Sequence, residues 1–390
     1  MTADLRAQWC LDPAVAYLNH GSYGACPRAV LELQGTLRLE MEREPVDFLS
    51  RRLPERIDAA RGALASFLGA DPAGLMFTTN VTTAVNAVLG SLELAPGDEL
   101  LATSHTYGAS RKTLDRIAVR HGARVVEVAL PFPVRDSAEL IEPVLAAVSA
   151  RTRLALLDHV TSPTALIMPI GQLVSQLRAR GIETLIDGAH APGMVPLALE
   201  GLGAAYYAGS AHKWLCAPKG AAFLYVRSDC RAGLHPTVIS HGYGGGLHAE
   251  FDWPGTFDPT PWLCVPATLA HLSKLLPGGW PELMATNRAL ALRGRALLTE
   301  ALEIDAPCPD DMIGAMASLP LPAPAAGAPA GVLDREALAT WFRERGVETW
   351  IAAPPFRILR LSAQLYNDLD EVRRLVSLLL QSLDGRTRSG

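Results

Sequence analysis

The stretch Tyr206–Val226, YYAGSAHKWLCAPKGAAFLYV, contains two apolar runs that are typical of neighbouring strands. Only the residues AHKWLCAPK separate the two runs. This connection is too short for the crossover that joins parallel strands, so we expect one of the two strands to run antiparallel to its neighbour. The connection also places Lys213 where the chain leaves a buried strand. The carboxyl ends of strands are where open α/β sheets bind ligands, so this lysine is a candidate for chemistry.

Short apolar runs of the same kind recur from about residue 75 to residue 226. Between them lie segments of helical period, such as SRKTLDRIAVRHG and IGQLVSQLRARG, which end at glycine. This alternation predicts an α/β fold with a seven-stranded, mostly parallel sheet that is covered by helices on both faces. The seven expected strands are residues 75–78, 99–103, 124–130, 154–160, 183–189, 204–210 and 220–226.

The pattern changes after about residue 265, where helical segments dominate. Two weak strand candidates, AMASLPL and FRILRLS, are separated there by the loop PAPAAGAPAG. A chain of 390 residues is long enough for one large domain and a smaller one. We predict an N-terminal segment that packs near the active site (1–20), a large α/β domain (21–264) and a small C-terminal α+β domain (265–390).

The composition excludes several classes of partner. The chain has 40 acidic and 35 basic residues, a net charge of -5 and no basic block, which argues against a nucleic-acid partner. The N-terminus lacks the basic start and apolar run of a secretion signal, and no run reaches the roughly 18 apolar residues of a membrane span. Six widely spaced cysteines are typical of reduced thiols. We therefore expect a cytoplasmic protein without a membrane partner.

Polar residues follow most of the predicted strands. The first strand is followed by a Thr/Asn cluster that opens a helix, which offers free N–H groups to an anion. The later strand ends add an aromatic residue, a carboxylate and a lysine. The candidate residues at these positions are Asn80, Val81, Thr82, His105, Tyr107, Ser162, Asp187, His190, Ser210, His212 and Lys213.

One cofactor uses all of these parts. Pyridoxal phosphate needs a lysine for its aldehyde, an acid that keeps its ring nitrogen protonated, donors for its phosphate and a ring to stack on. The protonated ring withdraws electrons from the Cα atom of the substrate. We expect Lys213 to form the Schiff base and then to carry the Cα proton, and Asp187 to pair with the ring nitrogen.

The sequence resembles the class V aminotransferase family of fold-type I pyridoxal-phosphate enzymes, and within it the isopenicillin-N epimerase-like branch. The resemblance runs from Tyr17 to Ser362, and its most specific part is Asp187-Gly-Ala-His190 followed by Ser-Ala-His-Lys213. It implies the fold-type I transferase fold and a homodimer with shared active sites. Thr256, in a Gly-Thr turn, would reach the phosphate of the neighbouring subunit.

The resemblance also implies roles for single residues. His190 would lie near the phenolic oxygen of the cofactor, and Arg360 would bind the substrate carboxylate with its planar fork. The residues expected to hold the phosphate are Val81, Thr82, Ser210 and His212, with Asn80 at the turn. The residues expected on the substrate side are Asn19, His20, Gly21 and Arg360.

Some assignments stay open at this point. Lys219 competes with Lys213, although Ala-Pro-Lys-Gly is typical of a hairpin turn, and His105 competes with Tyr107 as the stacking residue. Ser162 stands in a Val-Thr-Ser stretch where many members of the family have an asparagine against the phenolic oxygen. No metal site is expected, because the histidines around the glycine-rich stretch at 241–248 lack an evident third ligand.

The expected reaction begins with loss of the Cα proton of an amino-acid substrate to Lys213. An epimerase would return the proton, and a C–S lyase would expel a β-substituent, with Tyr107 as a candidate acid. The stretch GVETWIAAPPF, before Arg360, lacks the loop cysteine of the desulfurases in this family. An aminotransferase and a non-catalytic binding protein with the same fold are the alternatives.

Overall fold

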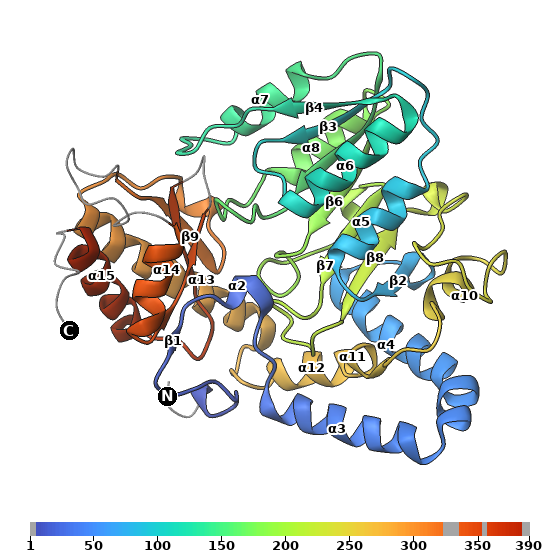
Figure 1. Cartoon of the computed structure of the whole chain (residues 1–390), viewed down its shortest axis with the longest axis horizontal. Coiled ribbons are helices and arrows are strands. Elements are labelled where there is room, and N and C mark those ends of the chain that lie inside the picture. Colours follow the sequence, from blue (N-terminus) through green and yellow to red (C-terminus); the bar gives the residue numbers. More distant parts are fainter. Residues whose placement is uncertain (1–4, 323–334, 353–356, 384–390) are drawn as a thin grey trace.

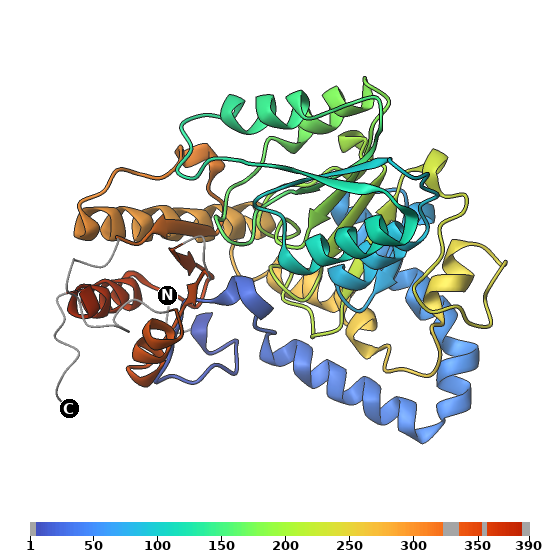
Figure 2. The ribbon, with the colours of Figure 1, turned by 45° about the horizontal axis from the view of Figure 1, so that its top comes forward.

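The computed structural model describes residues 5–322, 335–352 and 357–383. A large domain with a central sheet lies on one side of the molecule and a smaller domain lies on the other (Figure 1). The N-terminal segment runs between the two domains, and both views show it there (Figure 2). Most of the loop PAPAAGAPAG lies outside the described residues.

The central sheet has seven strands in the order β2-β8-β7-β6-β5-β3-β4. The five neighbours β7, β6, β5, β3 and β4 are parallel, whereas β8 runs antiparallel to both β2 and β7. The predicted fold class and the antiparallel strand are therefore confirmed. The strands are β2 (Leu75–Thr78), β3 (Glu99–Thr103), β4 (Arg124–Val128), β5 (Thr152–Asp158), β6 (Glu183–Gly188), β7 (Tyr206–Ser210) and β8 (Ala222–Val226).

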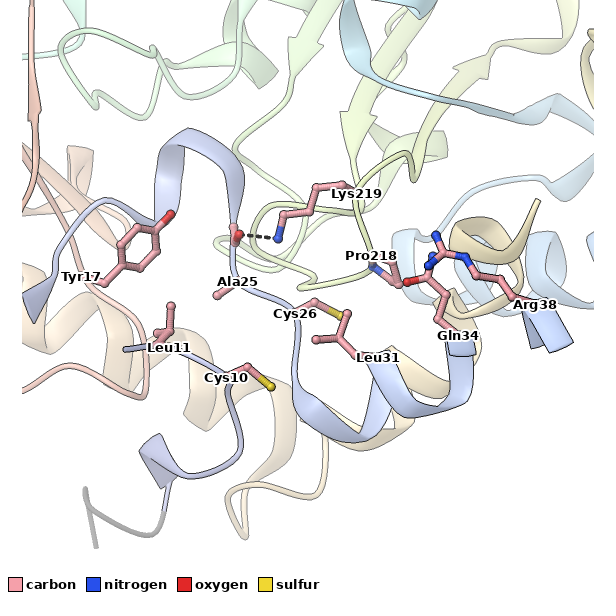
Figure 3. Close-up of a pocket in the computed structure, with 11 residues that line it drawn as sticks. Cys10, Leu11, Tyr17, Ala25, Cys26, Leu31, Gln34, Arg38, Pro218 and Lys219 are labelled. Carbon is pink, nitrogen blue, oxygen red and sulfur yellow. Dashed lines mark hydrogen bonds between the residues drawn. The ribbon is translucent and has the colours of Figure 1, made fainter. Parts of the chain in front are cut away.

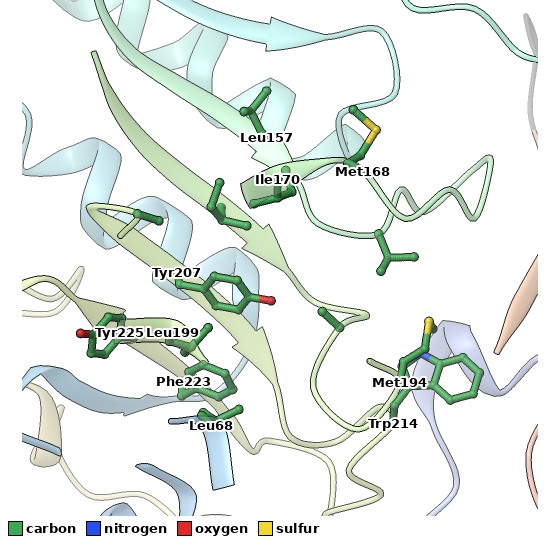
Figure 4. Close-up of a cluster of buried hydrophobic side chains, with 14 of the residues drawn as sticks. Leu68, Leu157, Met168, Ile170, Met194, Leu199, Tyr207, Trp214, Phe223 and Tyr225 are labelled. Carbon is green, nitrogen blue, oxygen red and sulfur yellow. The ribbon is translucent and has the colours of Figure 1, made fainter. Parts of the chain in front are cut away.

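Helices cover both faces of this sheet because its strands are apolar on both sides. In β5, Leu154 and Leu156 pack against α5 (Val81–Gly90) and α6 (Gly108–His121), while the alternating Ala155 and Leu157 join the opposite core. That opposite core, part of which Figure 4 shows around Tyr207, Phe223 and Trp214, also includes side chains from the helices on its side of the sheet. Those helices are α4 (Leu53–Leu68), α7 (Ala138–Ala146), α8 (Ile170–Arg178), α11 (Thr260–Leu263) and α12 (Val265–Leu272).

Within its described residues, the small domain combines three helices with a three-stranded antiparallel sheet in the order β11-β12-β9. Its strands are β9 (Met316–Pro320), β11 (Trp350–Ile351) and β12 (Ile358–Ser362), and its helices are α13 (Gly279–Leu302), α14 (Arg335–Glu344) and α15 (Leu369–Leu383). Strand β1 (Ala16–Tyr17) of the N-terminal segment pairs with β10 (Val347–Glu348) of this domain. The two-residue strands β1, β10 and β11 have no clear signal in the sequence.

The remaining helices belong to the N-terminal region and to connections. They are α2 (His20–Tyr23), α3 (Arg28–Arg43), α9 (Leu199–Leu202) and α10 (Leu247–Asp252), with short 3₁₀ or π turns at Asp47–Arg52, Pro72–Gly74, Ser228–Cys230 and Asp310–Met312. Helix α12 follows residue 264 but packs against α3 and α4, so the boundary at 264 stays a prediction. Over the described ranges, no helix is both long and apolar enough to cross a lipid bilayer.

Candidate active site

A pocket of about 200 Å³ opens at the carboxyl ends of the parallel strands. Its walls combine strand ends, the start of α5 and the short helix α2. The predicted residues among its lining are Asn80, Val81, Thr82, Tyr107, Ser162, Asp187, His190, Ser210, His212 and Lys213. Four further lining residues were not predicted: Ser22, Tyr23, Asp158 and Ala189.

Lys213 lies in a tight turn between β7 and β8. A Cβ atom on Gly24 (φ +67°) would overlap the carbonyl oxygen of His212 and lie 2.9 Å from that of Lys213. On another side, a Cβ on Gly193 (φ +84°) would lie 2.6 Å from the carbonyl oxygen of Trp214. The backbone that carries Lys213 is therefore packed against two glycines that hold left-handed conformations, which other residues adopt only with strain.

The side chain of Lys213 points to His190. Its Nζ lies 3.3 Å from His190 Nε2, and the indole N–H of Trp214 donates to His190 Nδ1 at 3.4 Å. An indole nitrogen can only donate, so Nδ1 must be unprotonated and Nε2 carries the ring proton. Burial lowers the pKa of Lys213 to about 8 and holds the pKa of His190 well below its usual value. His190 is thus a neutral ring whose Nε2–H faces the amine of Lys213, and this amine loses its proton more readily than that of an ordinary lysine.

Lys219 lies apart from this pocket. Its Nζ donates to the carbonyl oxygen of Gly24 at 2.7 Å, and it lines a separate pocket with Cys10, Cys26 and Pro218 (Figure 3). Lys213 is therefore the lysine that shares a pocket with Asp187.

Asp187 is the last acidic residue of β6 and is 3% exposed. One carboxylate oxygen accepts from the N–H of Ala189 at 3.1 Å, and the other accepts from the hydroxyl of Ser110 at 3.0 Å. Burial raises the pKa of Asp187, and the two donors oppose that rise. The next residue, Gly188, has to be glycine, because a Cβ there would overlap the ring of Tyr207.

The start of α5 forms the side of the pocket expected to hold an anion. Asn80 is the N-cap, and its side-chain oxygen accepts from the N–H of Thr83 at 2.8 Å. Val81 and Thr82 occupy the first turn, where N–H groups lack helical partners. From the other side, Ser210 ends β7 and His212 donates from Nδ1 to the carbonyl oxygen of Ala221 at 2.7 Å. Burial lowers the pKa of His212 to about 4, so this ring is neutral.

Tyr107 and His105 are placed differently. Tyr107 is the N-cap of α6, lines the pocket and is 45% exposed. His105 is fully buried behind the pocket wall, with Nδ1 3.0 Å from the hydroxyl of Thr164. Of the two stacking candidates, Tyr107 therefore faces the pocket.

Arg360 lies one layer behind the pocket. Its guanidinium is 1% exposed and lies over the ring of Trp350, and it donates to the carbonyl oxygen of Ser162 at 2.6 Å and to the hydroxyl of Ser22 at 3.2 Å. Burial lowers the pKa of Arg360 to about 10. Since Ser22 and Ser162 both line the pocket, the guanidinium is separated from it by small polar side chains.

None of the other residues predicted on the substrate side lines the pocket. Asn19 accepts from Ser22 at 2.6 Å. A Cβ atom on Gly21 would lie 2.5 Å from the sulfur of Met316 and 3.1 Å from the hydroxyl of Ser362, so Gly21 packs closely against the small domain. His20 points away, with Nδ1 2.7 Å from the hydroxyl of Tyr366 and Nε2 3.0 Å from the carbonyl oxygen of Lys213. The substrate-binding roles of Asn19, His20 and Gly21 therefore stay predictions. In the structure, His20 contacts the backbone of Lys213.

Thr256 is exposed and does not line the pocket of its own chain. Among the residues that were not predicted, Ser110 and Asp158 are buried and contact or adjoin Asp187. The sequence does hold a signal for Asp158, because LALLD and TLID both end an apolar run on an aspartate.

Comparison with known proteins identifies the family of this chain. Residues 40–261 match the family described as aminotransferase class-V. The chain belongs to this family. An isopenicillin N epimerase from Streptomyces clavuligerus is 37% identical over 96% of this chain and 97% of the relative. A second one from Amycolatopsis lactamdurans is 38% identical and covers 97% of both chains.

Other relatives catalyse C–S bond cleavage according to their names. A probable chloroplastic L-cysteine desulfhydrase from Arabidopsis thaliana is 32% identical over 80% of this chain and 69% of the relative. A solved cystine C-S lyase is 23% identical, with a TM-score of 0.78 over 94% of this chain and 97% of that one. The structural likeness shows that both share the fold.

Pyridoxal phosphate is the cofactor of this family, and the pocket fits it. The buried amine of Lys213 faces the same space as the carboxylate of Asp187 and the first turn of α5. The residues that would hold the cofactor are Lys213 for its aldehyde carbon, Asp187 for its ring nitrogen, and the α5 turn with Ser210 and His212 for its phosphate.

Proposed function

We propose that this chain is a pyridoxal-phosphate enzyme that removes the Cα proton of an amino-acid substrate, acting as an epimerase or as a C–S lyase. The observation that carries the proposal is the placement of Lys213, whose amine lies 3.3 Å from the neutral His190 in the pocket that also holds Asp187. When bound, the cofactor supplies an electron sink that makes the Cα–H bond of the substrate acidic.

In this proposal, Lys213 is the base and Tyr107 is the acid. Lys213, with a pKa of about 8, accepts a proton near neutral pH. Burial raises the pKa of Tyr107, so its hydroxyl keeps its proton and suits the role of acid. Asp187 would keep the ring nitrogen protonated, and Arg360 would position the substrate carboxylate after exchanging its contacts with Ser22 and Ser162.

Epimerisation is the first candidate, because the isopenicillin N epimerases match over almost their whole length. C–S lyase activity is the second, because the desulfhydrase relatives are 33% and 32% identical to this chain over the aligned parts, which are 70% and 69% of their own lengths. Desulfurase chemistry is disfavoured by the lack of a cysteine in residues 346–356, of which residues 353–356 lie outside the described part.

To test the proposal, the protein is incubated with L-amino acids and cysteine conjugates in deuterium oxide. The variant Lys219→Met, which lacks a lysine outside the pocket, serves as the control and should react like the wild type. Deuterium at Cα without pyruvate supports an epimerase, and release of pyruvate with a thiol or sulfide supports a lyase. Accumulation of pyridoxamine phosphate from the amino donor alone would instead identify an aminotransferase. If no substrate exchanges its Cα proton or changes the cofactor spectrum, the proposal is wrong.

We further propose a homodimer in which Thr256 of each chain completes the pocket of the other. Thr256 is exposed and does not line the pocket of its own chain. The exposed Val238 lies close to Pro254, two residues before Thr256, so an apolar side chain is available for contact there. Sedimentation velocity should give a dimer, and a monomer that retains full activity would contradict this. The cytoplasm is the proposed compartment, because all six cysteines are free.

A further inference from the structure

Two aspartates lie side by side at the floor of the pocket. Asp158 ends β5 and Asp187 lies near the end of β6, and their Cα atoms are register partners on these parallel strands. Neighbouring strands are about 4.8 Å apart, so any group that contacts one carboxyl is within reach of the other. Asp158 is 4% exposed and Asp187 is 3% exposed, and both line the pocket.

Two buried carboxylates at this separation repel each other strongly, so one proton is shared by the pair. The hydrogen bonds decide which member is charged. Asp187 accepts from Ala189 N–H and from the hydroxyl of Ser110, and both donors favour a carboxylate. Asp158 Oδ2 has no hydrogen-bond partner among the described residues, which is costly for a carboxylate and much less so for a carboxylic acid.

The other groups around Asp158 do not reverse this assignment. Two backbone N–H groups, that of Tyr107 at the start of α6 and that of Asp158 itself, donate to the Asp158 carboxyl, and Lys213 from the loop after β7 is a cation near the pair. Each of these contacts favours the carboxylate, but each has a smaller effect than burial or the charge of Asp187. His105, which follows β3, is engaged with Thr164 instead. Burial, followed by the charge of Asp187, raises the pKa of Asp158 well above its usual value.

We infer that Asp158 is the protonated member of a carboxyl pair and keeps Asp187 as the single carboxylate that faces the ring nitrogen of the cofactor. This inference rests on the proposed function for the identity of the ligand. With the proton on Asp158, one negative charge in the pocket floor meets one positive charge on the ring, and the charges balance. Asp158 is thus a positioning residue that acts through Asp187.

The experiment compares the wild-type holoenzyme with Asp158→Asn, an uncharged substitution of nearly the same shape, and with Asp187→Asn. Infrared difference spectra between wild type and Asp158→Asn at neutral pH should show the C=O band of a protonated carboxylic acid in the wild type. The affinity of Asp158→Asn for pyridoxal phosphate should stay within about threefold of wild type, whereas Asp187→Asn should bind at least about tenfold more weakly, since it loses a charged hydrogen bond.

The pH dependence of thermal unfolding adds a second readout. A carboxyl group whose pKa is raised by folding stabilises the protein below the pKa of about 3.9 of an unfolded aspartate, and this stabilisation is lost as the pH rises through its folded pKa. The unfolding midpoint of Asp158→Asn should therefore rise relative to wild type with increasing pH. Asp158→Leu should show the same trend, which keeps the test available if the asparagine variant does not fold.

Carboxylate bands in place of the acid band, a loss of affinity in Asp158→Asn equal to that in Asp187→Asn, or a midpoint difference that does not change with pH would each overturn the inference. These results are separable from a failure of the proposed function. A wild-type protein that binds no pyridoxal phosphate would end the proposed function, whereas the infrared band and the unfolding midpoints would still report the proton on Asp158.

Discussion

The two sides of the pocket are built differently. On the side of the large sheet, Asp187, Ser210 and Lys213 face the pocket directly from strand ends and the turn after β7. On the side of the small domain, Arg360 lies one layer back and is already hydrogen-bonded to Ser22 and Ser162. The proposed cofactor groups thus already face the pocket, whereas a substrate carboxylate that binds Arg360 as proposed would have to replace its polar partners.

The largest effect is expected on the sheet side. Lys213→Ala would remove both the proposed covalent anchor and the proposed base, so the rate of Cα deuterium exchange should fall at least about 10³-fold. The fall should appear in kcat, measured by mass spectrometry of the substrate. Exchange at more than a tenth of the wild-type rate would show that another group is the base.

A smaller effect, in a different parameter, is expected on the side of the small domain. Arg360→Lys loses the planar fork, so KM should rise about 10- to 100-fold while kcat changes much less. The absorbance of the bound cofactor serves as the control and should not change. A drop in kcat at unchanged KM would mean that Arg360 does not bind the substrate carboxylate.

The lowered pKa of Lys213 gives the sheet side a pH signature. Capture of pyridoxal phosphate by the cofactor-free protein needs the neutral amine, so its rate should rise about tenfold per pH unit below the pKa. The rise should level off near pH 8, where the pKa of Lys213 lies, as measured by stopped-flow absorbance. A rate that still rises steeply above pH 9.5 would place the pKa near that of an ordinary lysine, about 10.4.

Gly24→Ala tests how the N-terminal segment supports the sheet side. The new Cβ would overlap the carbonyl oxygen of His212, so the Lys213 turn must shift, and stability should fall by more than the about 1–2 kcal/mol of a left-handed alanine. Gly181→Ala is the matched control, with φ +75° and open space around its Cβ. Equal unfolding midpoints and equal cofactor spectra for the two variants would contradict the packing argument.

The smallest effect is expected at Lys219. Lys219→Met removes one hydrogen bond to Gly24 and should lower stability by about 1 kcal/mol, with activity within about twofold of wild type. Thermal unfolding measures the change in stability, and Cα deuterium exchange measures the activity. A large loss of activity would show that the pocket beside Cys10 and Cys26 takes part in the reaction.

The same contrast explains what the sequence could predict. The strands of the large sheet are short, continuous apolar runs that alternate with helical segments, so their ends can be predicted, and most of the residues predicted there share one pocket. Asp158 was missed because the apolar run predicts a strand to residue 160, which hides an aspartate that in fact ends β5. Strands β1 and β10 pair although they lie near opposite ends of the sequence. Each has two residues, which is too short for a recognisable strand pattern, so this pairing could not be predicted.

Ser110 shows a second kind of limit. It lies inside α6, where a serine looks ordinary, and its hydrogen bond to Asp187 depends on how that helix packs on the sheet. The layer around Arg360 is similar, because Ser22, Ser162 and Arg360 come from three distant segments. Contacts of this kind follow from tertiary packing, which local patterns do not specify.

The central claim is that Lys213 carries the cofactor. Reduction of the holoenzyme with borohydride, followed by protease digestion and mass spectrometry, tests it most directly because reduction fixes the lysine–cofactor bond. We predict one phosphopyridoxyl group per chain on the peptide that contains Lys213, with Lys219 unmodified. Modification of Lys219 instead, or no modified peptide from a protein saturated with pyridoxal phosphate, would contradict the account.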